Sequence, residues 1–418
     1  MVGSQHVNRG RAIEHRFGFG AGTRFIVGIA VAGFSAAGWG AEWSVQPAVG
    51  VSVGRESNPL LTTATHESST VTWVTPSMRI QGRTELSEID LGLVLNYKNY
   101  STDQVEDSDQ QILSLNAFTQ TSERTRLGLV GEFRRDNLRE TVNTGTSASS
   151  GSDADVGLLQ ANVTRDRRNL RPTWTQALSE KNSVQLAYEI TDVGFDNTAG
   201  TDLVDFTDQN LALSFSHSIN PRDSFTIGTN VSRYRAPATV NTSDNTTDTT
   251  RLLVGFARAF SETSRGSISV GASKTKEDIA GTVDHASGFV LEATAREVSE
   301  IMEIDGSISH DVSPSGSGRS IQSDQLRMRL LRSISPTLRF ALRATLLRNK
   351  VLEGSDASVD RRYYEVEPAL EYQWTSQWSV RTGFAYRYQK FDADPTSANS
   401  NIVFVGVAYN WQRQFFGR

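Results

Sequence analysis

The 418-residue chain contains no cysteine. This absence excludes disulfide bonds, thiolate metal sites and cysteine nucleophiles. A secreted protein of this length has a core large enough to fold without disulfides, and a barrel closes its own sheet edges without them. Histidine is also scarce, with six residues, and no zinc or phosphate-binding motif is present. We therefore expect no cofactor and no metal site.

The chain also lacks a long hydrophobic run. Its only candidate is Phe25–Ala37, thirteen residues without a charge, and a membrane-spanning helix needs about 20. Arginines precede this run and small residues follow it, which is the layout of a secretory signal. We predict that residues 1–41 are a cleaved signal peptide, with cleavage near Gly40. A single N-terminal anchor helix is the alternative.

The composition excludes two classes of protein. With 37% hydrophobic and 21% charged residues, the chain is too polar for a bundle of membrane helices. Residues 1–41 carry four arginines and one glutamate, so their removal changes the formal net charge from −5 to −8. Nucleic-acid binding needs a basic face, so an acidic mature chain argues against a nucleic-acid partner.

Alternation of apolar and polar residues with a period of two recurs along residues 42–418. Four clear examples are 89–97, 184–190, 338–347 and 378–388. This period is typical of β-strands, and no sustained helical period competes with it. The mature chain is therefore predicted to be all-β and to form one domain.

The connections between these segments fall into two classes. Short turns recur about every forty residues, at 82–85, 121–124, 179–182, 220–223, 261–264, 296–299, 333–336 and 375–377. Long polar stretches separate them, at 55–69, 101–109, 137–169, 195–208, 235–250, 274–287, 311–322, 349–361 and 390–399. This arrangement predicts a transmembrane up-and-down antiparallel β-barrel with short periplasmic turns and long external loops.

Eight short turns join sixteen strands, and a first strand at 43–53 with a last one at 402–411 makes eighteen. Sixteen strands is the alternative, because 153–164 reads either as a further strand or as part of an external loop. The structural rivals are a soluble β-sandwich and a β-solenoid. Sandwich connections are not sorted so regularly, and no solenoid repeat is visible.

The last predicted strand has an apolar face that ends in Tyr409 and Trp411. Its spacing of Gly406, Tyr409 and Trp411 resembles the C-terminal assembly signal of outer-membrane barrels. Two departures are Phe404, where that signal usually has a polar residue, and the seven residues that follow Trp411. An amphipathic strand of a soluble protein would show the same alternation.

The start of the mature chain is similar to a known family. A first strand at 43–54, then Arg55-Glu-Ser-Asn-Pro59, then Thr72-Trp-Val-Thr-Pro-Ser-Met78, resembles the β-barrel porin-2 family. Pro172-Thr-Trp174 ahead of a Ser-Glu turn is similar too. The resemblance implies an outer-membrane barrel associated with exopolysaccharide-biosynthesis operons, and polysaccharide export components as partners. It assigns no catalytic residue, and turn chemistry explains Asn58 and Pro59 equally well.

If the apolar positions face lipid, the alternate positions face the lumen, where they place many charges. The candidate pore residues are Glu303, Asp305, Arg327, Arg329, Arg339, Arg343, Glu365, Glu367, Glu371, Arg381 and Arg387. Two interpretations stay open. The charges create a transverse field that selects polar solutes, or they pair along a wet wall. Aromatics such as Tyr372, Trp374, Tyr386 and Tyr388 fall on the lipid face, which favours interfacial girdles.

An outer-membrane hydrolase is the alternative from another class. It would need a histidine or an acidic pair beside a nucleophile. His66 and His285 lie in predicted external loops, His310 close to one, and His217 near a periplasmic turn. None has a serine or aspartate partner at readable spacing, so we expect no catalytic residues.

These observations predict a non-enzymatic barrel in the Gram-negative outer membrane that passes polar solutes or secreted polysaccharide. The alternative is a closed or plugged barrel that serves as a scaffold for an export system. The expected partners are outer-membrane lipids, the barrel assembly machinery and polysaccharide export components.

Overall fold

The computed structural model describes residues 41–138, 163–196, 198, 201, 203–239, 243–352 and 360–416. All regular secondary structure in these residues is β-strand. The strands are β1 (Glu42–Glu56), β2 (Ser69–Arg83), β3 (Ser87–Tyr100), β4 (Ser108–Ser122), β5 (Thr125–Asn137), β6 (Thr164–Ala177), β7 (Asn182–Asp196), β8 (Phe206–Ser218), β9 (Asp223–Ala236), β10 (Asn245–Ala259), β11 (Ser264–Ile279), β12 (Thr282–Val298), β13 (Met302–Pro314), β14 (Ser320–Ser333), β15 (Leu338–Val351), β16 (Arg361–Gln373), β17 (Trp378–Phe391), β18 (Ala398–Asn410) and β19 (Gln414–Phe416).

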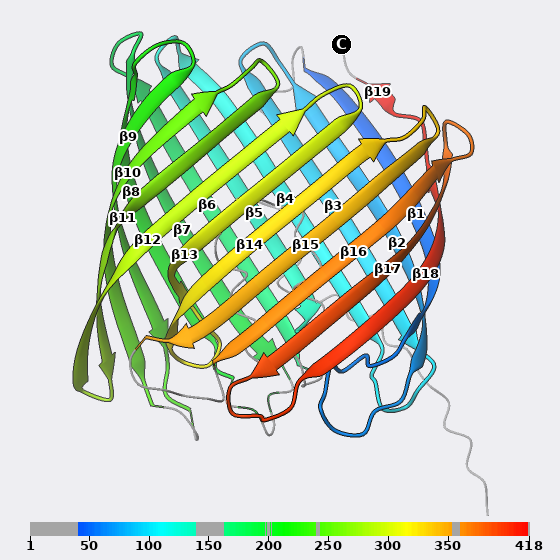
Figure 1. The fold of residues 1–418 in the computed structure, drawn as a ribbon. Coiled ribbons are helices and arrows are strands. Elements are labelled where there is room, and N and C mark those ends of the chain that lie inside the picture. Colours follow the sequence, from blue (N-terminus) through cyan, green and yellow to red (C-terminus); the bar gives the residue numbers. More distant parts are fainter. Residues whose placement is uncertain are drawn as a thin grey trace, which may run out of the picture.

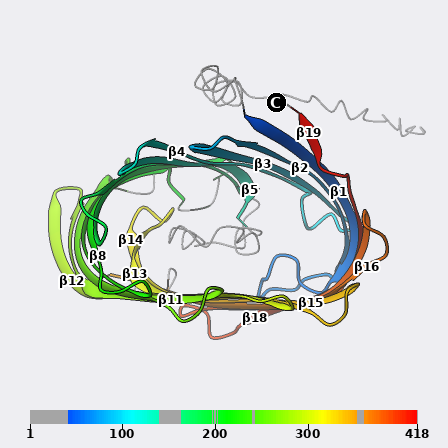
Figure 2. The same cartoon turned by 90° about the horizontal axis from the view of Figure 1, so that it is seen from above.

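The strands form one closed antiparallel barrel. Each strand pairs with its sequence neighbours, and β18 returns to pair with β1 from Ala48↔Asn410 to Glu56↔Ile402. The views from the side and from above show the closed wall (Figures 1 and 2). Because β1 and β18 pair, the ring has no free edge strand, and neighbouring strands pair along most of the wall. The predicted closure by the first and last strands is confirmed.

The count of eighteen strands is also confirmed, because β19 continues β18 beyond a bulge. The ladder on β1 steps from Ala48↔Asn410 to Val45↔Gln414, so one extra residue lies on the C-terminal strand. The amide of Trp411 donates to the carbonyl of Pro47 at 3.1 Å within this step. The residues after Trp411 therefore extend the closing seam.

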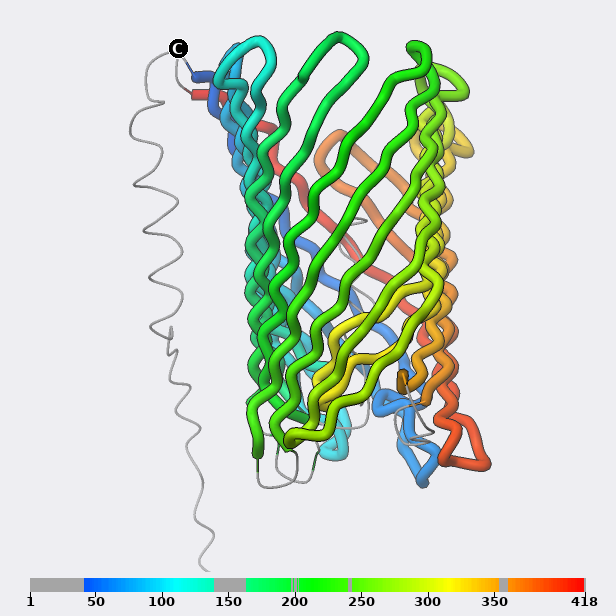
Figure 3. The backbone as a smooth tube through the Cα atoms, turned by 90° about the vertical axis from the view of Figure 1, so that its left-hand side faces the viewer, coloured from blue at the N-terminus to red at the C-terminus, as the bar shows by residue number. Residues whose placement is uncertain are grey.

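The barrel wall is apolar outside and polar inside. On β18, Val403, Val405 and Val407 are 60%, 47% and 40% exposed, although they are among the most hydrophobic residues of the strand. Outward apolar side chains recur on strands all round the barrel, and the tilted strands carry them across its height (Figure 3). A closed barrel with an apolar exterior is the architecture of Gram-negative outer-membrane proteins.

Within the described residues there is no helix long and apolar enough to cross a membrane.

All eight predicted short turns join consecutive strands. Local polar side chains fix their geometry. Ser335 Oγ accepts the amide of Leu338 at 3.0 Å, and Thr375 Oγ1 accepts the amide of Trp378 at 3.0 Å. Such side-chain bonds replace the ladder bonds that a turn cannot make.

One predicted long loop is wrong. Residues 274–287 belong to β11 and β12, which are joined by Ala280 and Gly281 alone. Both have positive φ, 51° and 85°, the geometry that a two-residue hairpin turn requires. The polar composition of this stretch reflects a hairpin at the outer end of the barrel. Residues 153–162 of the proposed extra strand lie outside the described residues, and so do residues 1–40 of the predicted signal peptide.

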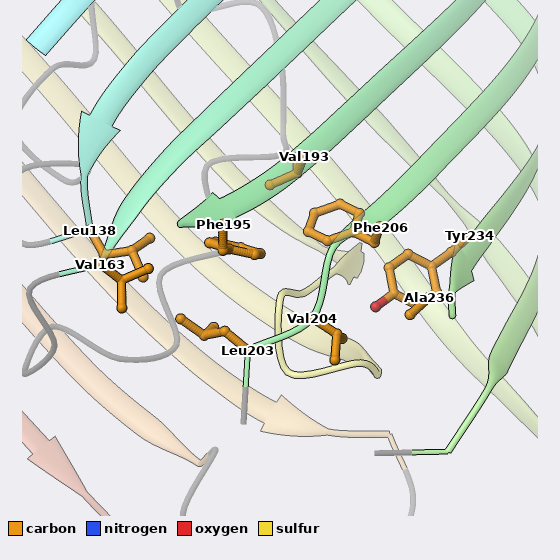
Figure 4. Packing of buried hydrophobic residues seen from close by; sticks show 9 residues of the cluster. All are labelled: Leu138, Val163, Val193, Phe195, Leu203, Val204, Phe206, Tyr234 and Ala236. Carbon is orange, nitrogen blue, oxygen red and sulfur yellow. The ribbon is translucent and has the colours of Figure 1, made fainter. Parts of the chain in front are cut away.

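A hydrophobic cluster lies inside the barrel at the end that carries the long loops. It joins the ends of β5 to β9 to the segment before β8 (Figure 4). Its members are Leu138, Val163, Val193, Phe195, Leu203, Val204, Phe206, Tyr234 and Ala236. The cluster fixes the chain before β8 against the inner wall and so narrows the outer half of the lumen.

Candidate functional site: the charged lumen

The acidic side chains of β16 are paired with arginines of the two neighbouring strands. Glu367 binds Arg381 at 2.5 Å and lies 3.8 Å from Arg343, while Glu371 binds Arg339 at 3.3 Å. Glu365 accepts the hydroxyl of the buried Tyr363 at 2.6 Å. These contacts follow from the antiparallel register, which places the carboxylates of one strand opposite the guanidinium groups of the next.

Further along the wall, the lining of one cavity carries more arginines than carboxylates. One register row crosses five ladders and places six charged residues side by side. In order from β11 to β16 these are Arg265, Arg296, Asp305, Arg329, Arg343 and Glu367. We call the four arginines of this row the lumen arginine row. Arginine stands directly opposite arginine at two places, Arg265↔Arg296 and Arg329↔Arg343.

Acidic residues compensate only part of the lumen arginine row. Arg296 lies 3.5 Å from both Glu303 and Asp305. In the described part of the chain, Arg265 and Arg329 have no carboxylate within 4 Å. The row borders a cavity of about 750 Å³, to which Arg222, Arg327 and Glu365 also contribute. The wall is therefore arranged to attract an anionic group.

Both interpretations of the lumen charges describe part of the wall. The charges on β15, β16 and β17 are largely paired, whereas the part of β11 to β14 that lines the cavity carries four arginines and two carboxylates. Register explains the difference, since each acidic residue of β16 faces at least one arginine on a neighbouring strand. In the lumen arginine row, Asp305 is the one acidic residue between Arg265 and Arg343. The role of these residues in passage stays a prediction.

The outer half of the lumen contains a hairpin that leaves the wall. The β12–β13 ladder ends at Leu291↔His310, although β12 begins at Thr282 and β13 continues to Pro314. The β13–β14 ladder continues to Pro314↔Ser320. Seen from above, the end of this hairpin lies inside the ring of strands (Figure 2). We call residues 311–320 the inner hairpin.

Five bonds hold the inner hairpin against β9, β10 and the chain before β8. Arg251 donates to Asp311 at 2.8 Å and to the carbonyl of Val312 at 2.7 Å. At the tip, three further donors bind backbone carbonyls. They are Tyr234 Oη to Ser315 at 2.7 Å, Asn245 Nδ2 to Gly318 at 2.8 Å and the Val204 amide to Gly316 at 2.8 Å. The inner hairpin is thus a fixed constriction, with a polar cavity of about 340 Å³ beside it.

A buried ion pair joins the lumen to the seam. Arg387 of β17 lies 3.3 Å from Glu56 at the end of β1, and the Glu56 side chain is 2% exposed. Ser400 Oγ also donates to Glu56 at 3.3 Å. Arg387 was predicted to line the pore, but its charge is neutralised under the loop that follows β1. Alternation places Glu56 and Arg251 on the inner faces of β1 and β10, but their partners lie on strands distant in sequence, so the two pairs could not be found from the sequence.

His310 corrects the expectation that no histidine has an aspartate partner. Its Nδ1 contacts Asp324, and Gln322 Nε2 lies 3.2 Å from its Nε2. Residue 324 faces residue 310 across the β13–β14 ladder, a relationship that spacing along the chain does not reveal. The described contacts of this pair include no serine nucleophile. In the same residues, no group of three or more metal-ligating side chains occurs.

The three residues of the predicted assembly signal lie on both faces of the seam. Tyr409 and Trp411 contact each other edge to face at 4.7 Å, and Tyr409 lies 4.8 Å from Trp378. Gly406 faces Ser52 of β1, and Phe404 packs against Trp73 at 5.9 Å. Phe404 is accommodated because Gly383 and Gly54 stand beside it. The signal itself stays a prediction.

No family model matches the chain. No curated protein matches it either. Among solved structures, the FrpB iron transporter from Neisseria meningitidis (F3-3 variant) is similar with a TM-score of 0.48 and 10% identity, over 88% of this chain and 81% of that one. Acinetobacter baumannii OccAB2 has a TM-score of 0.43 and 10% identity, over 88% and 98%. Pseudomonas aeruginosa OpdQ has 0.41 and 9%, also over 88% and 98%. These low values assign neither a family nor a solute.

Proposed function

We propose that the chain is an outer-membrane channel for polar solutes, with a preference for anionic ones. The observation that carries the proposal is the lumen arginine row, in which Arg265 and Arg329 have no acidic partner among the described residues. Opposed arginines repel each other, and an anion that passes between them removes that repulsion. The paired charges on β15 to β17 supply the polar wall that a hydrated solute needs.

The test is ion selectivity in planar bilayers. A salt gradient across the reconstituted barrel should give a reversal potential of the sign that anion preference requires. Arg265→Gln and Arg329→Gln together should shift it towards cation preference, because the uncompensated charges are removed. Arg233→Gln is the matched control, since Arg233 pairs with Asp248 and lies 50% exposed outside the cavity. An unchanged reversal potential in the double variant would contradict the proposal.

A closed barrel that acts as a scaffold is the second candidate, and the inner hairpin favours it. Five bonds fix this segment inside the lumen, which is more than a freely open passage needs. Conductance separates the two candidates. Current steps from the wild-type barrel support the channel, whereas their absence after verified insertion supports the scaffold.

Secreted exopolysaccharide is the polymer that the resemblance of the N-terminal motifs suggests as cargo. An acidic polysaccharide would suit the lumen arginine row, because its carboxylates repeat along the chain as the arginines repeat across the wall. Comparison of exported polysaccharide from cells with and without this protein tests the idea, with Arg265→Gln/Arg329→Gln as the diagnostic variant. Among the described residues, no nucleophile contacts His310 or Asp324, so this pair does not support a hydrolytic role.

A further inference from the structure

A row of three cations crosses the outer face of the barrel at the long-loop end of β15, β16 and β17. Arg348 stands opposite Arg362 in one ladder, and Arg362 stands opposite Lys390 in the next. These strands lie side by side in the wall (Figure 1). Neighbouring strands are about 4.8 Å apart, so three positive charges project from one face at close spacing. We call Arg348, Arg362 and Lys390 the outer cation row.

The outer cation row lies at the border of the apolar exterior. The next row towards the membrane centre is Leu346, Tyr364 and Tyr388, in the same two ladders. Tyr364 and Tyr388 stack with parallel rings 4.3 Å apart, and Leu346 and Tyr364 are exposed. Tyrosines at this depth mark the membrane interface. The cations are therefore at the height of lipid headgroups on the external side.

Little within the described residues compensates these charges. Arg362 has one carboxylate nearby, Asp392 at 3.7 Å, and Arg348 has no ion pair or hydrogen bond. Asp324 stands opposite Arg348 on the other side but contacts His310 instead. Lys350 lies on the same face, two residues further along β15, and adds a fourth positive charge. Like charges directly opposite each other in a sheet are destabilising unless a counter-ion neutralises them.

The far wall shows the opposite arrangement at the same end. There three exterior arginines each have a carboxylate, with Arg135–Asp166 at 3.0 Å, Arg168–Asp192 at 3.4 Å and Arg233–Asp248 at 2.6 Å. Arg235 and Lys276 on that side have no ion pair among the described residues, but neither stands opposite another cation in its ladders. In the described ladders, three outward cations stand directly opposite one another on β15 to β17.

We propose that the outer cation row binds the phosphate groups of the phosphorylated glycolipid that forms the external leaflet of the outer membrane. Two guanidinium groups can each donate two hydrogen bonds to a phosphate, and Lys390 adds a point charge. Leu346 and the stacked tyrosines lie beside the first acyl carbons and sugar rings of the same lipid. Basic residues at a membrane surface bind anionic headgroups by this combination of charge and adjacent apolar contact. The inference is independent of whether the lumen conducts.

The test measures lipid binding by the full-length barrel in detergent, with diphosphorylated lipid A as the probe and native mass spectrometry as the readout. The variant R348Q/R362Q/K390Q should bind at least about tenfold more weakly, since each lost charge-assisted bond contributes about 1.5–3 kcal/mol. The matched control R135Q/R168Q/R233Q removes three exterior cations from the far wall and should bind within about twofold of wild type.

Three further binding measurements identify which phosphate-containing molecule the outer cation row binds. Dephosphorylated lipid A should bind weakly, and neither inorganic phosphate nor phosphatidylglycerol at equal concentration should displace the phosphorylated glycolipid. Equal loss in the control variant, equal binding by the dephosphorylated lipid, or displacement by either competitor would overturn the proposal. Heat-dependent gel migration shows whether the triple variant folds. If it does not fold, single variants replace it: Arg362→Gln should weaken binding, and Arg362→Lys should keep part of the wild-type binding. Equal binding by those two variants would also overturn the proposal.

Discussion

Arg251 of β10 donates to Asp311 of β13 at 2.8 Å, although β11 and β12 lie between these strands in the wall. The contact is possible because β13 leaves β12 after His310 and turns into the lumen. This ion pair is one of five bonds that hold a piece of the wall inside the passage that the rest of the wall encloses.

Breaking this pair should widen the channel. Arg251→Ala removes the bonds to Asp311 and Val312 and should weaken docking of the inner hairpin by about 1.5–3 kcal/mol, because the half-exposed Asp311 loses its charge partner. We expect larger single-channel conductance in planar bilayers. Arg168→Ala breaks an exterior pair and should leave conductance unchanged. Equal conductance of Arg251→Ala and wild type would mean that the inner hairpin does not limit flow.

A disulfide should form between the inner hairpin and the chain before β8. The amide of Val204 donates to the carbonyl of Gly316 at 2.8 Å, which brings the two backbones close enough for a Val204→Cys/Gly316→Cys pair. No native cysteine competes, since the chain has none. Mass spectrometry should detect the bridge, and conductance of the oxidised variant should equal that of wild type. Free thiols under oxidising conditions would contradict the inward position of the inner hairpin.

Removing acidic charge from the lumen should act in the opposite sense to removing arginine. Glu367→Gln frees Arg343 and Arg381 from their shared partner and should increase anion preference. The reversal potential under a salt gradient measures the change. Glu371→Gln frees only Arg339 and should give a smaller shift of the same sign. A shift towards cations in either variant would contradict the assignment.

A methyl group at Gly406 should destabilise the seam. Its Cβ would lie 2.0 Å from Ser52 Oγ and 3.0 Å from the carbonyl oxygen of Val51. Gly406→Ala should therefore cost about 1–3 kcal/mol in free energy of unfolding. Heat-dependent gel migration should show unfolding at a lower temperature, and Ser52→Gly should restore part of the loss. Gly50→Ala is the control from the same seam, where the nearest atoms are 4.0 Å away.

Acid should loosen one external loop contact. Asp394, between β17 and β18, accepts bonds from Thr396 and Thr63, and these hydrogen bonds hold the pKa of its carboxyl below the ordinary value of about 4. A lowered pKa in the folded state contributes stability above the unfolded pKa and loses it as pH falls through the folded pKa. Hydrogen exchange of residues 392–397 should rise below about pH 4, and Asp394→Asn should abolish that dependence. A rise that begins near neutral pH would implicate another group.

The strands and turns of the barrel wall could be predicted from the sequence because each is determined by residues that are close together in the chain. Alternation at 338–347 and 378–388 places each side chain on a face, and the serine and threonine turns set the joints. The closing pair of β1 and β18 followed from the even strand count. The lumen positions followed in turn, since a strand that is correctly assigned has only two faces.

The contents of the lumen could not be predicted in the same way. Arg251 and Asp311 meet because a hairpin leaves its ladder, and no period in the chain records such a departure. Glu56 pairs with Arg387 across the seam between β1 and β18, and His310 contacts Asp324 across the β13–β14 hairpin. The prediction of a loop at 274–287 was wrong because it rested on polar composition alone. Polar composition there indicates exposure to water, and a strand that extends beyond the membrane is as polar as a loop.

The bulge between β18 and β19 also bears on how the barrel forms. The first strand of the described chain is completed only by the last two, so β1 has an unsatisfied edge until the C-terminal segment arrives. A seam between the two ends of the chain is the most non-local contact available and is formed late. During biogenesis the nascent sheet therefore exposes two free edges for the whole time that β2 to β17 are added. A chain shortened by its last few residues would lose the pairs of β19 with Trp43, Ser44 and Val45, so the start of β1 would keep a free edge although β18 still closes the rest of the seam.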